Sequence, residues 1–347
     1  MAKGVGILFV ILGHISLTPS ALKIWIYSFH MPLFFACSGL TFSISKYSDY
    51  GAFAKAKIRS ILIPYFCLGI TLWALSLLFN ISRQLFQGNS IEVNLNIWRV
   101  FLSLLLGHRL HRYYFSLWFL CVLFFSELIF YFFVKYERQG SLYYAAIACV
   151  SLGVQYLVFK CVQGWFLSLD LIPTGIAFLA MGKMFRKLEE SRPMACRKIW
   201  QIPIALVLSI LTTALNYRIS GRTDLYYCRI GNPVLYGLSA MIGSWFVFLV
   251  LTHLGELRIT EYFGRNSLVT YAYQNSFCIP VAKYITDVTS DHIHLVSGDI
   301  TLQWLMIICL TLLISTTLIE IINRSFPWML GRKKRKEYGA SPARCST

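Results

Sequence analysis

The sequence is poor in charged residues, and acidic residues are the scarcest of them. Only 14% of the 347 residues are charged, and 15 Asp and Glu residues stand against 32 Lys and Arg residues. A soluble domain carries about 25% charged residues, so a soluble enzyme is excluded. No stretch is polar enough and long enough to form a second, soluble domain.

Motifs for metal sites and disulfide frameworks are missing as well. Ten cysteines are scattered along the chain without a CxxC pair or a Cys/His cluster of zinc spacing. Most of them lie within apolar runs, where cysteine is a small apolar core residue. Cys161 and Cys228, both expected in outer loops, are the one pair that could form a disulfide. We therefore expect no metal cofactor.

A basic patch interleaved with aromatic residues, which nucleic-acid binding requires, is also missing. The formal net charge is +17, but the basic residues lie between the apolar runs. That distribution is typical of residues that set the orientation of membrane helices, and nucleic-acid binding is excluded.

Long apolar runs dominate what is present, since 57% of the residues are hydrophobic and 16% are aromatic. Most of these runs are long enough to cross a hydrocarbon core of about 30 Å. The sequence predicts an all-α, polytopic membrane bundle of about ten helices. The expected helices are residues 3–17, 24–43, 58–79, 113–134, 141–159, 165–185, 200–215, 233–254, 267–285 and 301–322.

The distribution of charge predicts the orientation in the bilayer. With ten crossings, both termini and most Lys and Arg residues lie on one side, and the acidic loop 287–299 lies on the other. The positive-inside rule then places both termini on the cytoplasmic side of the membrane. The basic tail, residues 331–347, is expected to be disordered and to contact anionic lipid.

Two histidines in the first two apolar runs are the candidate catalytic residues. His14 precedes the first interhelical turn by a few residues and His30 follows it by a similar number, so both imidazoles reach a similar depth. An ionisable side chain inside a membrane is costly, which makes a matched pair a candidate site. The alternative is a structural hydrogen bond between packed helices.

Lysine and arginine residues near the cytoplasmic surface are the candidate donor-binding residues. Lys3 and His14 are eleven positions apart, which is about three helical turns or roughly 16 Å along one face. Lys3, Lys57 and Arg59 could contact a polyphosphate group. The alternative is orientation and attraction to lipid headgroups.

Five further residues are candidate substrate contacts. Arg109 and Arg112 lie in an expected outer loop, where they could hold an anionic or hydroxyl-rich molecule. Trp118 and Glu127 lie in the 113–134 helix, and a Glu in mid-membrane needs a partner or a proton. It could position a histidine or satisfy a neighbouring helix. Asp170 is either an interfacial residue or a contact for a sugar hydroxyl.

Together these motifs resemble the membrane-bound acyltransferase-3 family, in particular its fucose 4-O-acetylase-like branch. The resemblance covers nearly the whole chain. It is carried by the Lys3/His14 spacing, the FHMPLFF segment that ends in Ser-Gly (residues 29–39), the basic entry to Ile-Pro-Tyr (57–65), Leu-Trp-Phe-Leu (117–120) and Gly-x-Asn-Ser-Leu (264–268).

The resemblance implies a single acyltransferase-3-like membrane domain over residues 1–330 and acetyl-CoA as a cytoplasmic donor. The acyl group would be transferred to a hydroxyl of a cell-envelope saccharide, such as O-antigen, exopolysaccharide or a lipid-linked glycan, on the periplasmic side. His14 would be the essential base or a transient acyl carrier, and His30 would orient it or share its proton. Where relatives often have a histidine, this chain has Gln274.

Two other functions fit parts of the sequence. A saccharide or small-molecule transporter would need no acyl-CoA, but no inverted repeat is visible. A haem b protein could use His14 and His30 as axial ligands, which a visible absorption spectrum would reveal. The sequence carries no information about the oligomeric state.

Overall fold

The computed structural model describes residues 1–86, 102, 117–137, 140–161, 165–191, 193, 198–292 and 299–332. Regular structure in this part of the chain is helical, apart from one isolated bridge between Asp224 and Arg229. The predicted all-α bundle is therefore confirmed. The longer helices are α1 (Ala2–His14), α2 (Ser20–Leu40), α3 (Tyr50–Lys57), α4 (Ile63–Phe86), α6 (Trp118–Lys135), α7 (Gly140–Cys161), α8 (Ile172–Ser191), α9 (Gln201–Ser220), α10 (Pro233–Leu254), α11 (Arg258–Arg265), α12 (Ser267–Tyr273), α13 (Ile279–His292) and α15 (Ile300–Ser325).

Seven of the described helical segments are long and apolar enough to cross a membrane. They are Tyr50–Phe86, Trp118–Lys135, Gly140–Cys161, Phe166–Ser191, Gln201–Ser220, Pro233–Leu254 and Ile300–Ser325. The protein is thus a polytopic membrane bundle, while ten crossings remain a prediction. α1 has only 13 residues, because the helix ends at His14 rather than near residue 17. α2 has 21 residues, but polar residues such as Lys23 and His30 lower its hydropathy.

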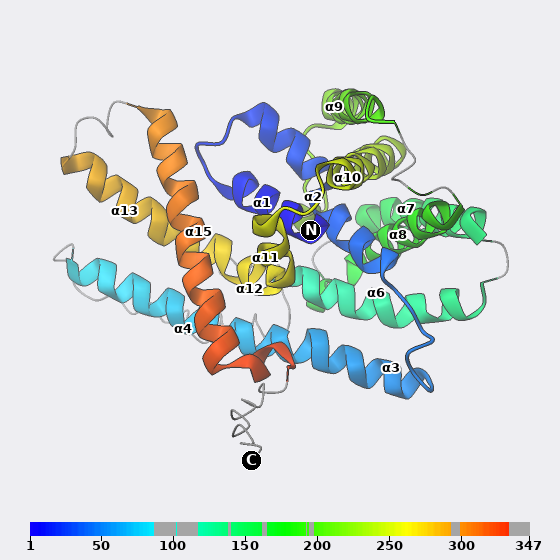
Figure 1. Cartoon of the computed structure of the whole chain (residues 1–347), viewed down its shortest axis with the longest axis horizontal. Helices are drawn as coiled ribbons and strands as arrows, with labels where there is room; N and C mark the ends of the chain where they lie inside the picture. Colours follow the sequence, from blue (N-terminus) through cyan, green and yellow to red (C-terminus); the bar gives the residue numbers. More distant parts are fainter. Residues whose placement is uncertain are drawn as a thin grey trace, which may run out of the picture.

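α2 lies at the centre of the bundle, with α1, α8 and α10 packed against it (Figure 1). Phe29, Leu33 and Phe35 of this helix are completely buried. By contrast, α9 exposes many large apolar side chains, which suits a helix that faces lipid. The first two predicted helices therefore form the interior of the fold.

Close contact between α2 and α8 depends on glycine. A Cβ atom at Gly182 would lie 2.0 Å from the backbone oxygen of Ala36, and one at Gly39 would lie 2.0 Å from the backbone oxygen of Leu179. Because backbone atoms cannot move aside as a side chain end can, only glycine permits this helix spacing.

Replacement of Gly182 by alanine is therefore expected to separate α2 from α8 and destabilise the protein by about 1–3 kcal/mol. The measurement is the thermal midpoint of purified protein in detergent. Gly153→Ala in α7 is the control, because a Cβ there meets no atom within 4 Å. A midpoint for Gly182→Ala equal to that of Gly153→Ala would contradict the proposed packing.

Two short π-helical segments interrupt the helices near the functional region. They are Ile58–Leu62, between α3 and α4, and Gln274–Cys278, between α12 and α13. Each ends two residues before a proline, Pro64 or Pro280. Proline has no N–H for the helical ladder and its ring clashes with the carbonyl four residues earlier, so a wider turn accommodates it.

The observed helices at these two places are longer than the sequence suggested. The expected start at residue 58 was wrong, because residues 50–57 already form α3 and run into the π-helical turn. Likewise, the expected acidic loop after residue 285 begins as helix, since α13 continues to His292. Asp287 and Asp291 thus lie on a helix rather than in a loop.

Candidate active site

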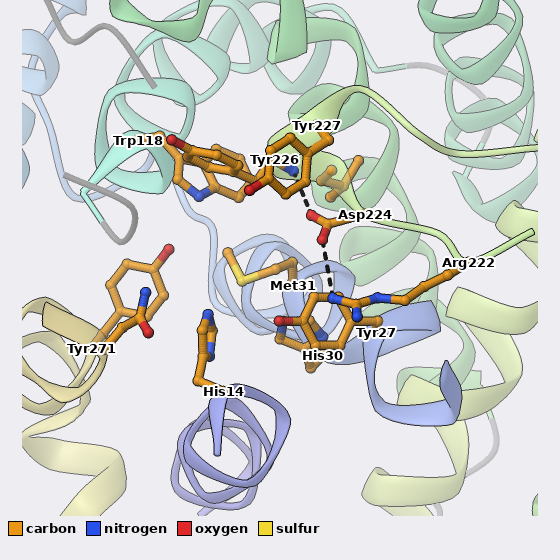
Figure 2. Close-up of a pocket in the computed structure, with 12 residues that line it drawn as sticks. His14, Tyr27, His30, Met31, Trp118, Arg222, Asp224, Tyr226, Tyr227 and Tyr271 are labelled. Carbon is orange, nitrogen blue, oxygen red and sulfur yellow. Dashed lines mark hydrogen bonds and ion pairs between the residues drawn. The ribbon is translucent and has the colours of Figure 1, made fainter. Parts of the chain in front are cut away.

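A cavity of about 340 Å³ brings the two predicted histidines together (Figure 2). We call it the histidine cavity. It is lined by His14, Tyr27, His30, Met31, Trp118, Arg222, Asp224, Leu225, Tyr226, Tyr227, Tyr271 and Asn275. Trp118, which was predicted to contact substrate, shares this cavity with both imidazoles. The expectation that His14 and His30 lie close together at a similar depth is therefore confirmed.

Backbone contacts fix the tautomer of both histidines. Nδ1 of His14 lies 2.7 Å from the carbonyl oxygen of Val10, and Nδ1 of His30 lies 2.8 Å from that of Ile26. A carbonyl can only accept a hydrogen bond, so each Nδ1 carries the proton and donates it. Each neutral imidazole therefore keeps the lone pair on Nε2, which can accept a proton from another molecule.

Tyr27 connects the two histidines to a charged pair. Its ring centroid lies 6.1 Å from that of His14 and 4.9 Å from that of His30. The guanidinium of Arg222 lies 4.0 Å from the centroid of the Tyr27 ring, and Nη2 of Arg222 lies 3.2 Å from Oδ2 of Asp224. A cation held over a tyrosine ring in this way is stabilised by the ring electrons.

Sequence reasoning missed Arg222, Asp224 and the tyrosines beside them. They come from the segment between α9 and α10, far from the first hairpin in the sequence, and form one side of the cavity (Figure 2). The only signal was a polar loop in which charged and aromatic residues follow one another closely: Arg222, Asp224, Tyr226, Tyr227 and Arg229. Without tertiary contacts, nothing in that loop indicated which cavity it would cover.

A second cavity, of about 410 Å³, contains three lysines from three segments, and we call it the lysine cavity. It is lined by Lys3, Phe34, Ser38, Thr41, Phe42, Ser43, Lys46, Tyr47, Lys57, Ser60, Ile61, Phe119, Leu120, Leu123, Glu127, Ser267, Leu268 and Tyr271. Lys3 also borders a third cavity of about 700 Å³, together with Arg186 and Arg265. Lys46 was not among the predicted site residues.

Lys57 and Glu127 neutralise each other in the lysine cavity. Nζ of Lys57 lies 2.8 Å from Oε2 of Glu127, and it also lies 5.6 Å and 5.3 Å from the rings of Phe42 and Phe53. Glu127 therefore satisfies a neighbouring helix and does not line the histidine cavity. Within the described ranges, Lys3 has no such carboxylate partner, so the cavity has an excess of positive charge.

Two predicted site residues lie outside both cavities. Nε of Arg59 donates a 2.9 Å hydrogen bond to the carbonyl oxygen of Gly331, which places this side chain at the C-terminal end of the described chain. Asp170 is buried, and Sγ of Cys228 donates to its Oδ2 at 3.6 Å. Cys161 and Cys228 do not form a disulfide with each other. Arg109, Arg112 and the tail beyond residue 332 lie outside the described residues.

Apolar side chains separate Lys3 from His14 along α1. Ile7 and Val10 lie between them on the helix, and both are completely buried. Tyr271 lines both the lysine cavity and the histidine cavity. The ring of this tyrosine is thus part of the wall between them.

Comparison with known proteins identifies the class of protein. Residues 1–320, nearly the whole chain, match the family model described as an acyltransferase domain, Acyl_transf_3. The chain belongs to the acyltransferase-3 family. No curated protein and no solved structure shows significant similarity to it. The resemblance seen in the sequence motifs is confirmed at the level of the family, and the fucose 4-O-acetylase-like branch stays a prediction.

Membership in the acyltransferase-3 family gives the two cavities a chemical context. An acyltransferase needs a group that accepts a proton from the acceptor and a place for an activated donor. In this acyltransferase, Nε2 of His14 and Nε2 of His30 belong to the histidine cavity. Lys3, which has no carboxylate partner among the described residues, belongs to the lysine cavity. The assignment of individual residues to these roles stays a prediction.

Proposed function

We propose that the protein is an inner-membrane O-acyltransferase that transfers an acetyl group from cytoplasmic acetyl-CoA to a hydroxyl of a cell-envelope saccharide. The observation that carries the proposal is the pair of imidazoles in one cavity, each with Nδ1 bonded to a carbonyl and Nε2 left as a base. The lysine cavity then faces the cytoplasm, and the histidine cavity faces the periplasm. Both termini lie in the cytoplasm, as the positive-inside rule predicts.

The lysine cavity has the chemistry that acyl-CoA requires. The donor carries phosphates at one end and the thioester at the other, and lysines bind phosphates as point charges. Lys3 and Lys46 are available for this contact, while Lys57 is engaged by Glu127. The hydroxyls of Ser38 and Ser60 can donate to further phosphate or carbonyl oxygens.

The reaction needs one base and no metal. Nε2 of His14 accepts the proton of the acceptor hydroxyl, and the oxygen attacks the thioester carbonyl. The C–S bond breaks, and the thiolate of CoA leaves with the proton that the imidazole held. His30 orients His14 or shares its proton. In the alternative, Nε2 of His14 attacks the thioester carbonyl, the C–S bond breaks and the CoA thiolate is released from an acyl-imidazole. The acceptor hydroxyl then attacks the acyl carbon, the N–C bond breaks, and the hydroxyl proton passes to the thiolate, which gives the same products.

The acceptor side of the cavity suits a sugar. Trp118, Tyr226 and Tyr227 present flat aromatic surfaces that can pack against the apolar face of a pyranose ring. The carboxylate of Asp224 accepts hydrogen bonds from hydroxyls, and the guanidinium of Arg222 donates them. Arg222 also suits an acidic sugar, in which case its ion pair with Asp224 would open.

The proposal is tested with the full chain reconstituted in vesicles. Acetyl-CoA with a labelled acetyl group is supplied on one side and a surface glycan fraction on the other, and O-acetyl groups are measured by mass spectrometry. Labelled acetate on the glycan supports the proposal. Passage of the saccharide without acyl-CoA and without any ester product would overturn it in favour of a transporter.

Titration of Asp224 is expected to make acceptor binding dependent on pH. Burial raises the pKa of Asp224, and the nearby Arg222 opposes this rise in part. The ionised carboxylate that holds Arg222 is present above this pKa and is lost as the pH falls through it. Because the pKa is raised, the loss begins at a higher pH than for an exposed aspartate.

We therefore expect the KM for the acceptor to rise on acidification in the wild-type protein. Asp224→Asn removes the titrating group, so its acceptor KM should be higher but flat over the same pH range. Steady-state kinetics at several pH values provide the measurement. An equal rise in KM on acidification in Asp224→Asn would show that another group is responsible.

A further inference from the structure

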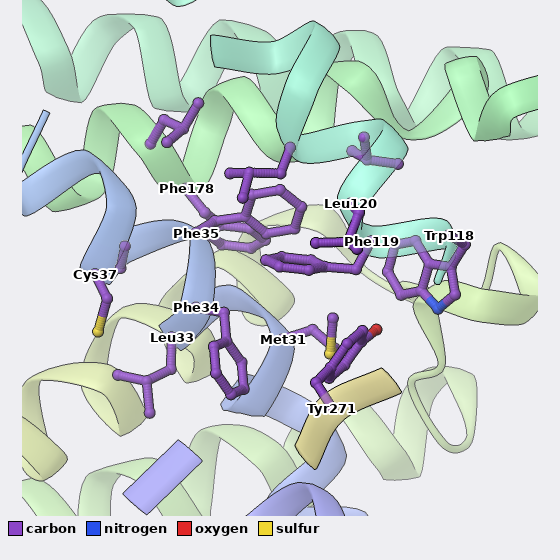
Figure 3. Close-up of a cluster of buried hydrophobic side chains, with 14 of the residues drawn as sticks. Met31, Leu33, Phe34, Phe35, Cys37, Trp118, Phe119, Leu120, Phe178 and Tyr271 are labelled. Atoms are coloured by element: carbon purple, nitrogen blue, oxygen red, sulfur yellow. The ribbon is translucent and has the colours of Figure 1, made fainter. Parts of the chain in front are cut away.

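Three aromatic rings in mutual contact lie on the side of the lysine cavity where Tyr271 borders the histidine cavity, and we call them the aromatic triad: Phe34, Phe119 and Tyr271. They come from α2, α6 and α12, and all three are buried (Figure 3). Phe34 and Phe119 line the lysine cavity, and Tyr271 lines both cavities. The triad therefore occupies the place where the donor side meets the histidine side.

The three rings contact one another in a closed arrangement. The centroids lie 5.9 Å apart for Phe34 and Phe119, 6.2 Å for Phe34 and Tyr271, and 5.5 Å for Phe119 and Tyr271. These are contact distances for tilted and edge-to-face rings, so no carbon atom fits between them. A group passes between these three rings only if a ring turns aside.

Residues behind the rings limit how far two of them can turn. The ring of Phe35, which is completely buried, lies 4.6 Å from that of Phe119. Behind Phe34 lies Gly6 of α1, where a Cβ atom would be only 3.1 Å from the ring. Phe34 and Phe119 are thus held from behind, and the opening that they allow is small.

We propose that the aromatic triad selects the acyl group by size, admitting acetyl and rejecting longer chains. This inference rests on the proposed function, because the thioester carbonyl on the donor side must come within reach of Nε2 of His14 across the triad. Each additional methylene of the acyl chain has to fit between the three rings, which are already in contact. In apolar pockets one methylene changes kcat/KM by about 10–200-fold, which is enough to separate acetyl from butyryl.

The test compares acetyl-CoA and butyryl-CoA as donors for the reconstituted full chain. We expect Phe34→Leu, Phe119→Leu and Tyr271→Leu each to raise the butyryl-to-acetyl ratio of kcat/KM at least about 10-fold. Three variants from three helices keep the test valid if one of them fails to accumulate in the membrane. Tyr271→Phe, which keeps the ring, should retain the wild-type ratio.

Phe130→Leu is the matched control, because Phe130 is a completely buried phenylalanine on the same helix as Phe119 and lines neither cavity. Its ratio should equal that of the wild type. An unchanged ratio in the triad variants, or the same increase in Phe130→Leu, would overturn the inference while acetyl transfer by the wild type still stands. If the wild type transfers no acyl group at all, the proposed function fails instead.

Discussion

His14→Ala is expected to lower the rate of acyl transfer by a factor on the order of 10²–10⁴. The variant lacks the Nε2 atom that accepts the hydroxyl proton, and also the atom that would carry the acyl group in the alternative order of steps. The measurement is kcat with acetyl-CoA and a glycan acceptor, together with the amount of protein in the membrane. That amount should stay close to the wild-type value, since His14 lies at the end of α1 and borders a cavity.

His253→Ala is a matched control for this prediction. Nδ1 of His253 also donates to a carbonyl oxygen four residues earlier, Leu249, at 2.9 Å, but the residue does not line the histidine cavity. Its replacement should leave kcat unchanged. Retention of wild-type turnover in His14→Ala would remove His14 from the chemistry.

His30→Ala separates two roles for the second imidazole. If His30 orients His14 or shares its proton, the double variant His14→Ala/His30→Ala should be no slower than His14→Ala alone, because the two residues act as a unit. If each histidine acts independently, the two losses multiply. The comparison needs only the four kcat values of a double-mutant cycle.

Much of the fold and part of the site follow from local sequence. The apolar runs predicted the helices, and counting outward from one turn predicted that His14 and His30 would meet. Both inferences use only helix geometry over a short stretch, where α1 and α2 are joined by a tight connection. The side chain of Lys3 was likewise placed at the opposite end of α1 from His14.

What the sequence could not show depends on contacts between distant segments. Arg222 and Asp224 reach the histidine cavity because of how the segment after α9 lies over α2, and no periodicity records that. The partner of Glu127 was open for the same reason, since α3 and α6 are far apart in the chain. The burial of Ile7 and Val10 between Lys3 and His14 arises from packing against other helices, which spacing along one helix cannot reveal.

Lys3→Gln is expected to raise the KM for acetyl-CoA about 10–100-fold with little change in kcat. A hydrogen bond to a charged group contributes about 1.5–3 kcal/mol, and each 1.4 kcal/mol is a tenfold change in affinity. Lys57→Ala should behave differently, because it leaves Glu127 buried without its partner. Removal of one member of a buried pair costs about 3–5 kcal/mol, so less protein should accumulate.

A donor without phosphates shows whether the higher KM of Lys3→Gln comes from lost phosphate contacts. S-acetylpantetheine carries the thioester without the nucleotide, so Lys3→Gln and the wild type should use it equally well if Lys3 binds phosphate. Lys55→Gln is the control, because Lys55 is an exposed lysine on α3 that does not line the lysine cavity. A similar loss with S-acetylpantetheine would instead place Lys3 near the thioester, or indicate that its charge orients α1.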